Sequence, residues 1–416
     1  MKYITTLAML LATTSLASAA SNESFIIQAG KKNTGIVSQV NGNNTQATAQ
    51  FGNNNSAVTT QTTSGKDTNK SGTLQIGNDN ASVAGQTGGN NKQGTAQVGN
   101  DNNAVTSQTN SSANENASRT FQFGNGNDSL ATQTGGANSQ TTIQFGAGKD
   151  SDNLVVTGQV NGTNGGQNNS RTIQGGSDNL VTTAQDTAGA AGKNAGAGGA
   201  NNQLTLQFGK DNTAINDQNS IGSGTTKKTA ASGVENNALT IQDGKDNLAV
   251  TRQSGSNPGE TPNQATNTSL TAQFGADNLA KVKQVSGNNA QATLQIGNDN
   301  AAITKQKTVD NGSGTNASLT VQVGDDNIAK TRQTIANPLN SGINGSLIAQ
   351  IGNNNKAVAR QNDTGIQPMI GANLQATLQV GNANNAVTTQ TASASVANTS
   401  VTAQFGSHNT AITSQH

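Results

Sequence analysis

Polar side chains recur at every second position along most of this chain. In each repeat one segment reads Ser/Gln-x-Thr-x-Gln-x-Gly and the next reads Asn-x-Ala-x-Thr-x-Gln, as in residues 46–52 and 55–61. A period of two is typical of β-strands, because successive side chains of a strand point to opposite faces. Each repeat therefore predicts a strand, a tight turn and a second strand.

The pair of segments occurs fifteen times. Every unit has a Gly two residues after its opening Gln and an Asn six residues before its closing Gln, and the closing Gln stands eleven positions after the opening Gln. The unit from Gln144 to Gln159 carries four more residues. The connections between units vary in length, which a solenoid tolerates because insertions bulge outward between coils. The prediction is an all-β fold, a β-solenoid of stacked strand-turn-strand repeats with a cross-β, amyloid-like spacing. At about 4.8 Å per coil the stack would measure roughly 70 Å.

Comparison of the units predicts which side chains face inward. Positions that stay Gln, Asn, Thr or Ala are expected inside, whereas positions that accept both Val58 and Lys281 are expected outside. The apolar residues expected on the outer face, where they would drive lateral packing, are Phe51, Ile76, Phe123, Phe208, Ile296 and Phe405. The alternative is an inverted arrangement with these residues inside and Gln and Thr in water.

Stacking in register would place equal amides above one another, so that they form hydrogen-bonded ladders along the axis. Such ladders are required if the amides are buried, because a buried amide without a partner is costly. The self-assembly ladder residues predicted in this way are Gln50, Asn55, Gln61, Gln75, Asn80, Gln86, Gln97, Asn102, Gln108, Gln122, Asn127, Gln133, Gln207, Asn212, Gln218, Gln295, Asn300, Gln306, Gln379, Asn384, Gln390, Gln404, Asn409 and Gln415. The predicted turn glycines, at positions suited to a positive φ, are Gly52, Gly77, Gly99, Gly124, Gly209, Gly297, Gly381 and Gly406.

Composition narrows the function classes. The 416 residues include 61 Asn, 39 Gln and 49 Gly, and the hydrophobic share is 31%, below the roughly 45–50% of globular chains. A formal net charge of +1 argues against nucleic-acid binding. With no Cys and only His408 and His416, we predict no catalytic, metal or cofactor-binding residues and no enzyme activity.

Three local patterns have competing interpretations. Asp-containing turns such as residues 297–300 and 324–327 are interpreted as plain turns rather than calcium-binding rolls. No Gly-rich stretch has the context of a phosphate-binding loop. The outward cations Lys281, Lys283, Lys305, Lys330, Arg332 and Arg360 are interpreted as a solvated face that limits edge pairing, with a polyanion-binding stripe as the alternative.

The first twenty residues predict a secretory signal peptide. Lys2 is followed by an apolar stretch over residues 4–16 and by the small residues Ala17, Ser18 and Ala19. The apolar stretch is shorter than a membrane-spanning helix needs, and no integral membrane segment is predicted. The expected domains are a signal peptide at residues 1–20 and a solenoid of about fifteen repeats at 21–416, with longer loops near 186–203, 219–237 and 254–267.

The unit resembles the curlin repeat of curli fibre subunits, which are functional amyloids. Matching positions in one unit are Ser118, Gln122, Gly124, Asn127, Ser129 and Gln133, and the likeness extends over residues 28–415. The resemblance implies an extracellular fibre of the biofilm matrix, exported through an outer-membrane pore and nucleated at the cell surface by a second subunit. The chain departs from the family in its larger number of repeats, in lacking Tyr beside the Gln, and in lacking a Gly-rich leader before the first unit.

From these observations we expect a secreted structural protein that polymerises with itself into cell-surface, curli-like amyloid fibres for adhesion. The alternative is a monomeric surface adhesin or ice-binding solenoid, in which the Thr columns would present a flat hydroxyl lattice.

Overall fold

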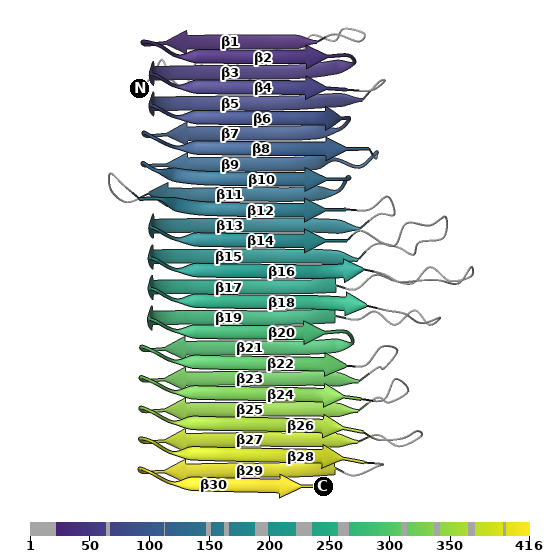
Figure 1. Cartoon of the computed structure of the whole chain (residues 1–416), viewed down its shortest axis with the longest axis vertical. Coiled ribbons are helices and arrows are strands. Elements are labelled where there is room, and N and C mark those ends of the chain that lie inside the picture. The colour runs from purple at the N-terminus through teal and green to yellow at the C-terminus, as the bar shows by residue number, and fades with distance from the viewer. Residues whose placement is uncertain are drawn as a thin grey trace, which may run out of the picture.

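The structure is a computed structural model that describes residues 22–63, 67–111, 113–146, 151–161, 166–187, 199–221, 235–256, 266–308, 314–336, 342–364, 371–393 and 397–416. In this part of the chain thirty strands form two parallel sheets of fifteen strands each. The strands lie across the long axis of an elongated stack, with β1 and β30 at opposite ends (Figure 1). The predicted all-β solenoid is confirmed. The predicted signal peptide and most of the predicted longer loops lie outside the described residues.

The odd-numbered strands form sheet A. In order they are β1 (Glu23–Ala29), β3 (Asn43–Asn53), β5 (Thr68–Asn78), β7 (Asn91–Val98), β9 (Asn116–Phe123), β11 (Asn138–Gly146), β13 (Gln167–Ser177), β15 (Ala200–Lys210), β17 (Glu235–Lys245), β19 (Thr266–Ala276), β21 (Asn288–Ile296), β23 (Thr315–Val323), β25 (Ile343–Ile351), β27 (Ala372–Val380) and β29 (Ala397–Phe405).

The even-numbered strands form sheet B. In order they are β2 (Thr34–Val40), β4 (Ser56–Thr62), β6 (Ala81–Gly88), β8 (Asn103–Asn110), β10 (Asn127–Thr134), β12 (Asn153–Val160), β14 (Leu180–Asp186), β16 (Thr213–Ile221), β18 (Leu248–Ser256), β20 (Leu279–Val285), β22 (Ala301–Thr308), β24 (Ile328–Ile335), β26 (Lys356–Asp363), β28 (Asn385–Ala392) and β30 (Thr410–Gln415).

Each repeat unit makes one coil, and equal positions of successive coils lie opposite one another. Gln50 of β3 is opposite Gln75 of β5, and Gln61 of β4 is opposite Gln86 of β6. The register survives the long connections, because Gln174 is opposite Gln207 although 33 residues separate them. A slip of one residue would turn every buried amide outward, so the polar inner face itself fixes the register.

The interior between the sheets is polar. The inward positions hold Asn, Gln, Thr and Ser with small Ala residues, and Gln50, Asn55 and Gln61 are fully buried. The apolar side chains predicted to face outward do so, and Phe123 and Phe405 are 38% and 66% exposed. A few other large apolar residues, among them Val155, Val181, Ile335 and Ile348, are buried. The inverted arrangement, with Phe inside and Gln in water, is therefore wrong for this fold.

Candidate functional site

The invariant glutamines form two continuous ladders, one in each sheet. In sheet A the Nε2 of each opening Gln donates to the Oε1 of the Gln in the next coil, from Gln28 to Gln404, at 2.6–3.0 Å. In sheet B the closing glutamines do the same from Gln39 to Gln415, at 2.7–2.9 Å. Both ladders donate toward the C-terminal end of the stack.

The invariant asparagines of sheet B form a third ladder with the opposite polarity. The Nδ2 of each Asn donates to the Oδ1 of the Asn in the preceding coil, from Asn409 back to Asn33, at 2.8–3.2 Å. The Asn ladder thus donates toward the N-terminal end, against the direction of the Gln ladders.

A fourth ladder, in sheet A, is absent from our sequence-based prediction. Asn occupies the position six residues before every opening Gln, from Asn22 to Asn398, and its Nδ2 donates to the preceding Asn Oδ1 at 2.8–3.2 Å in thirteen steps. Between Asn44 and Asn69 the side chain of Thr63 bridges the step. The signal was present in the sequence, because the spacing equals that between Asn and the closing Gln. Each unit is a tandem of two half-units, Asn-x-x-x-x-x-Gln.

Most ladder amides also donate to a main-chain carbonyl oxygen, and several of these bonds tie the two sheets together. Gln75 of sheet A also donates to the carbonyl oxygens of Ser56, 2.9 Å, and Asn80, 3.0 Å, and Asn80 of sheet B donates to that of Gly99 at 2.8 Å. Bonding of both protons removes the desolvation penalty that an unpaired buried amide would carry. The ladders therefore serve as the core of this protein.

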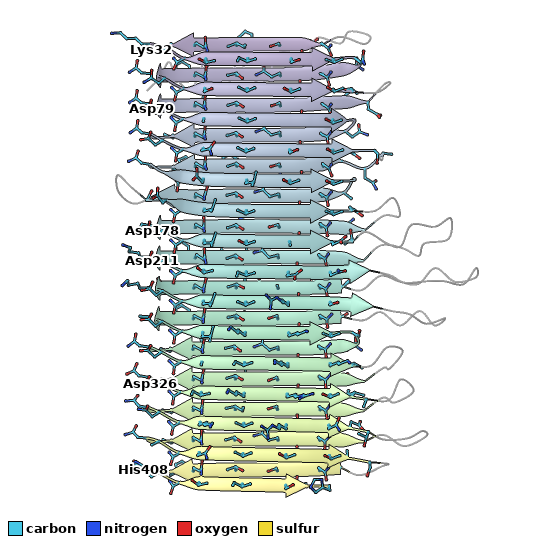
Figure 2. The ribbon with its side chains drawn as sticks, viewed as in Figure 1. Lys32, Asp79, Asp178, Asp211, Asp326 and His408 are labelled. Atoms are coloured by element: carbon cyan, nitrogen blue, oxygen red, sulfur yellow. The ribbon has the colours of Figure 1, made fainter. Side chains whose placement is uncertain are left out.

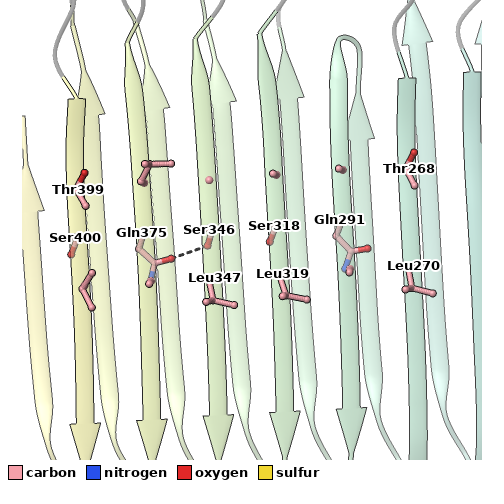
Figure 3. Close-up of a pocket in the computed structure, with 17 residues that line it drawn as sticks. Thr268, Leu270, Gln291, Ser318, Leu319, Ser346, Leu347, Gln375, Thr399 and Ser400 are labelled. Atoms are coloured by element: carbon pink, nitrogen blue, oxygen red, sulfur yellow. Dashed lines mark hydrogen bonds between the residues drawn. The ribbon is translucent and has the colours of Figure 1, made fainter.

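At the inward position four residues before the opening Gln, Ser and Gln alternate in most coils; Ala238 and the successive Ser318 and Ser346 are the exceptions. Ser118 donates to Gln140 at 2.7 Å, and Ser346 donates to Gln375 at 2.8 Å, as the dashed line in Figure 3 shows. The Gln of each pair turns its amide nitrogen to a Thr of its own strand, as Gln140 does to Thr142. A long side chain in one coil thus fills the space left by the short one in the next, which gives much of the stack a period of two coils.

The inward Thr residues differ from the ladder amides, because several of their hydroxyls form no hydrogen bond with a described residue. Within the described residues the hydroxyls of Thr157, Thr172, Thr183, Thr240 and Thr271 have no hydrogen-bond partner. Thr48 and Thr73 are buried as well, so the inward Thr columns of the two sheets do not present a flat hydroxyl lattice to solvent. The Thr-based argument for an ice-binding surface is therefore wrong.

Each turn between the two strands of a coil requires special backbone conformations. Gly77 has a φ of 122°, and a Cβ at this position would lie 1.8 Å from the carbonyl oxygen of Gly99 in the next coil. The eight predicted turn glycines all have positive φ, whereas Gly146, in the longer unit, does not. A left-handed residue follows the glycine by two positions; in Figure 2 examples lie along one edge of the stack: Lys32, Asp79, Asp178, Asp211, Asp326 and His408.

This turn edge also carries ion pairs. Lys210 lies 3.6 Å from Asp178 and 3.9 Å from Asp211, and Lys245 lies 3.2 Å from Asp246. The hydrogen bond that Lys245 donates to Asp246, together with the negative charge of that carboxylate, raises the pKa of Lys245. Exposed pairs such as these contribute little to stability. They neutralise part of the negative charge of the Asp residues stacked at this turn position, such as Asp178, Asp211 and Asp246.

The described residues contain no group of three or more His, Asp or Glu side chains that could hold a metal ion. No helix in the described ranges is both long and apolar enough to cross a membrane. The absence of enzyme activity stays a prediction.

No model of a known protein family matches this chain, and a search of curated proteins finds no match either. The basis for proposing a function is therefore the structure itself, above all its stacked Asn and Gln ladders.

Proposed function

We propose that this chain is a secreted structural protein that assembles end to end into extracellular, curli-like amyloid fibres for adhesion and biofilm matrix. The observation that carries the proposal is the complementarity of the first and last described coils. In the first described coil the Oε1 atoms of Gln28 and Gln39 accept no hydrogen bond from a described residue, while in the last described coil Gln404 and Gln415 donate to main-chain oxygens and to no described Gln.

The asparagine ladders add the reverse set of groups. Asn409 and Asn398 donate to the coil before them, but within the described residues nothing donates to their own Oδ1 atoms. The amides of Asn22 and Asn33 in the first coil are the donors that match them. A second copy placed head to tail would therefore continue all four ladders and both parallel sheets without a change of polarity.

The strand edges support the same arrangement. Among the described strands, β1 and β29 at the ends of sheet A, and β2 and β30 at the ends of sheet B, each have a single neighbour, so their outer edges are not paired with another described strand. Exposed edges of this kind template the addition of another chain. The apolar side chains outside, including Phe123 and Phe145 with ring centroids 5.4 Å apart, would support lateral bundling of fibres.

The resemblance to curlin repeats supplies the remaining parts of the proposal. It suggests export by a cleaved signal peptide and an outer-membrane pore, and nucleation by a second subunit at the cell surface. No enzyme activity, cofactor or nucleic-acid partner forms part of the proposal.

The test is polymerisation of the purified chain without residues 1–20. We expect fibres whose growth is accelerated by fragments of preformed fibre and whose diffraction shows spacings of about 4.7–4.8 Å and about 10 Å. Because the monomer already contains stacked strands, the decisive reading is seeding rather than diffraction. A chain that stays monomeric at high concentration in the presence of seeds would contradict the proposal.

A further inference from the structure

A row of five cations runs along the outer face of sheet B on consecutive strands. Arg252 of β18 lies opposite Lys283 of β20, followed in register by Lys305 of β22, Arg332 of β24 and Arg360 of β26. All five side chains are exposed. We call these five residues the basic row. It follows the stack axis, because the strands that carry it are parallel and in register (Figure 1).

Further cations flank the basic row. Exposed residues of the same strands add to its charge: Lys281, Lys307, Lys330 and Lys356. On β18, β20, β22, β24 and β26 no described outward position holds an acidic residue, and none of the nine cations forms an ion pair with a described residue. Elsewhere on the molecule, at the turn edge, Lys210 and Lys245 each lie beside a carboxylate.

This concentration of charge is unfavourable for the isolated protein. Neighbouring strands lie about 4.8 Å apart, and like charges directly opposite each other destabilise a sheet. At the same position most other coils carry small uncharged residues such as Thr60, Ser107 and Thr132, and the coil before the row carries the exposed Asp217 opposite Arg252. A solvated face needs no such row, whereas a bound polyanion would relieve the repulsion.

The shape of the row selects the kind of polyanion. A partner must present one anionic group after another along a straight line with a spacing close to that of the strands. The phosphates of a DNA duplex follow helical paths that leave a straight row after a few contacts. Single-stranded nucleic acids are usually held by aromatic stacking, and all eight Phe residues of the chain lie on strands of sheet A.

An extended acidic polysaccharide fits these requirements. A polyuronate carries one carboxylate on each sugar, and its sugar units repeat along the chain at a length close to one strand spacing. We propose that the basic row binds an extended polyuronate chain laid along the stack axis. This inference goes beyond the proposed fibre and holds for a single copy of the chain.

The experiment measures binding of polygalacturonate to the immobilised chain lacking residues 1–20. The test variant carries Arg252→Gln, Lys283→Gln, Lys305→Gln, Arg332→Gln and Arg360→Gln. The control variant removes the same number of exposed cations elsewhere through Lys31→Gln, Lys32→Gln, Lys70→Gln, Arg119→Gln and Arg171→Gln. Circular dichroism shows that both variants keep the β-fold, and neutral dextran serves as the uncharged polymer.

We expect the unaltered chain to bind polygalacturonate but not dextran, with an affinity that falls as salt rises. The affinity should drop about tenfold or more in the test variant and stay nearly unchanged in the control variant. Equal losses in both variants would show an effect of net charge and overturn the proposal. So would tighter binding of duplex DNA than of polygalacturonate, or an unaltered chain that binds neither.

Pairing of the row with the acidic turn edge of a second copy is the remaining alternative. It is measured by light scattering without polymer. If the test variant loses self-association while its affinity for polygalacturonate stays unchanged, the row is a contact between copies and the proposal is wrong.

Discussion

At each turn a single glycine determines how closely two coils can approach. The positive φ of Gly77 places its α-carbon against the carbonyl of Gly99, and the same contact recurs between Gly99 and Gly124. L-residues rarely adopt this conformation. The invariance of this Gly across the units is therefore explained by one backbone contact that is repeated along the stack.

Two glycines of the same strand provide a direct test. Gly77→Ala should lower the free energy of unfolding by at least about 1–3 kcal/mol, because it combines a strained φ with a backbone clash. Gly72→Ala, at an outward position of β5 with no heavy atom within 4 Å of the added Cβ, is the matched control and should be neutral or slightly stabilising. Denaturant unfolding of the two variants gives the comparison; similar losses would contradict the contact described.

A single carboxylate predicts a pH effect. Burial raises the pKa of Asp128 above its ordinary value of 3.8, and the charge of Asp152 raises it further, while a hydrogen bond from Asn103 acts in the opposite direction. A raised pKa means that folding disfavours the ionised form. The stabilisation of the folded state by the protonated form of Asp128 is thus present in full below about pH 3.8, and it is lost as the pH rises through the folded-state pKa.

Asp128→Asn should therefore raise the melting temperature at pH 7 and leave it unchanged at pH 3. The effect should be small, because the side chain is still exposed in part. Scanning calorimetry at the two pH values measures it. An equal shift at both values would mean that the charge of Asp128 is not the cause.

At the scale of the strand, the sheets are held by polar columns with fixed direction. The Gln ladders donate toward one end and the Asn ladders toward the other. Opposed ladders partly cancel the dipoles that aligned amides would otherwise add along the stack. A strand of this protein is defined less by its apolar residues than by an Asn at its start and a Gln at its end.

Much of this was predictable from the sequence. The strand pairs, the register, the inward Gln and the outward Phe123 follow from a period of two repeated fifteen times. The Asn ladder of sheet A does not follow from a unit that begins at its opening Gln, because such a unit places Asn44 in the variable connection. Hydrogen-bond direction could not be predicted, because it depends on amide orientation. The bridge by Thr63 between Asn44 and Asn69 could not be predicted either, because Thr63 lies in a connection whose sequence is not repeated in the other units.

The missed ladder gives a prediction of its own. In Asn138→Asp a carboxylate replaces an amide that donates to Asn116 at 3.0 Å and to the carbonyl of Thr134 at 2.9 Å. The new charge would be buried against these two acceptors, with the donor Asn168 at 2.9 Å but no cation to pair with it, so stability at pH 7 should fall by roughly 3–5 kcal/mol. The loss should shrink at a pH low enough to protonate the new carboxyl.

Asn54→Asp is the control for this change. Asn54 is exposed at the turn edge, where the next coil already has Asp79 in the same left-handed conformation. Chemical denaturation of both variants measures the difference. If Asn54→Asp destabilised the chain as much as Asn138→Asp, the buried ladder would not be the source of the loss.

At the scale of the whole molecule, the stack has a direction and two unlike ends. The first described coil offers Gln acceptors and Asn donors, and the last offers Gln donors and Asn acceptors. Two copies meeting head to head would set like groups against each other and would also reverse the strand direction. We therefore expect fibres that are polar along their axis, with every copy oriented alike.

The last prediction separates growth at the ends from stability of the stack. Gln404→Leu with Gln415→Leu alters the last coil, and Gln207→Leu with Gln218→Leu makes the same change in the middle. Each Leu leaves an amide of the neighbouring coil unpaired, at roughly 1–3 kcal/mol per buried group. In the middle the loss lies within an intact stack, whereas in the last coil it removes the donors that an incoming copy must meet. At equal concentration the lag time of fibre growth should therefore be longer for the terminal variant, while the unfolding free energy of the monomer should fall more for the middle variant. Equal lag times, or a longer lag for the middle variant, would show that the end coils are not the growing surfaces.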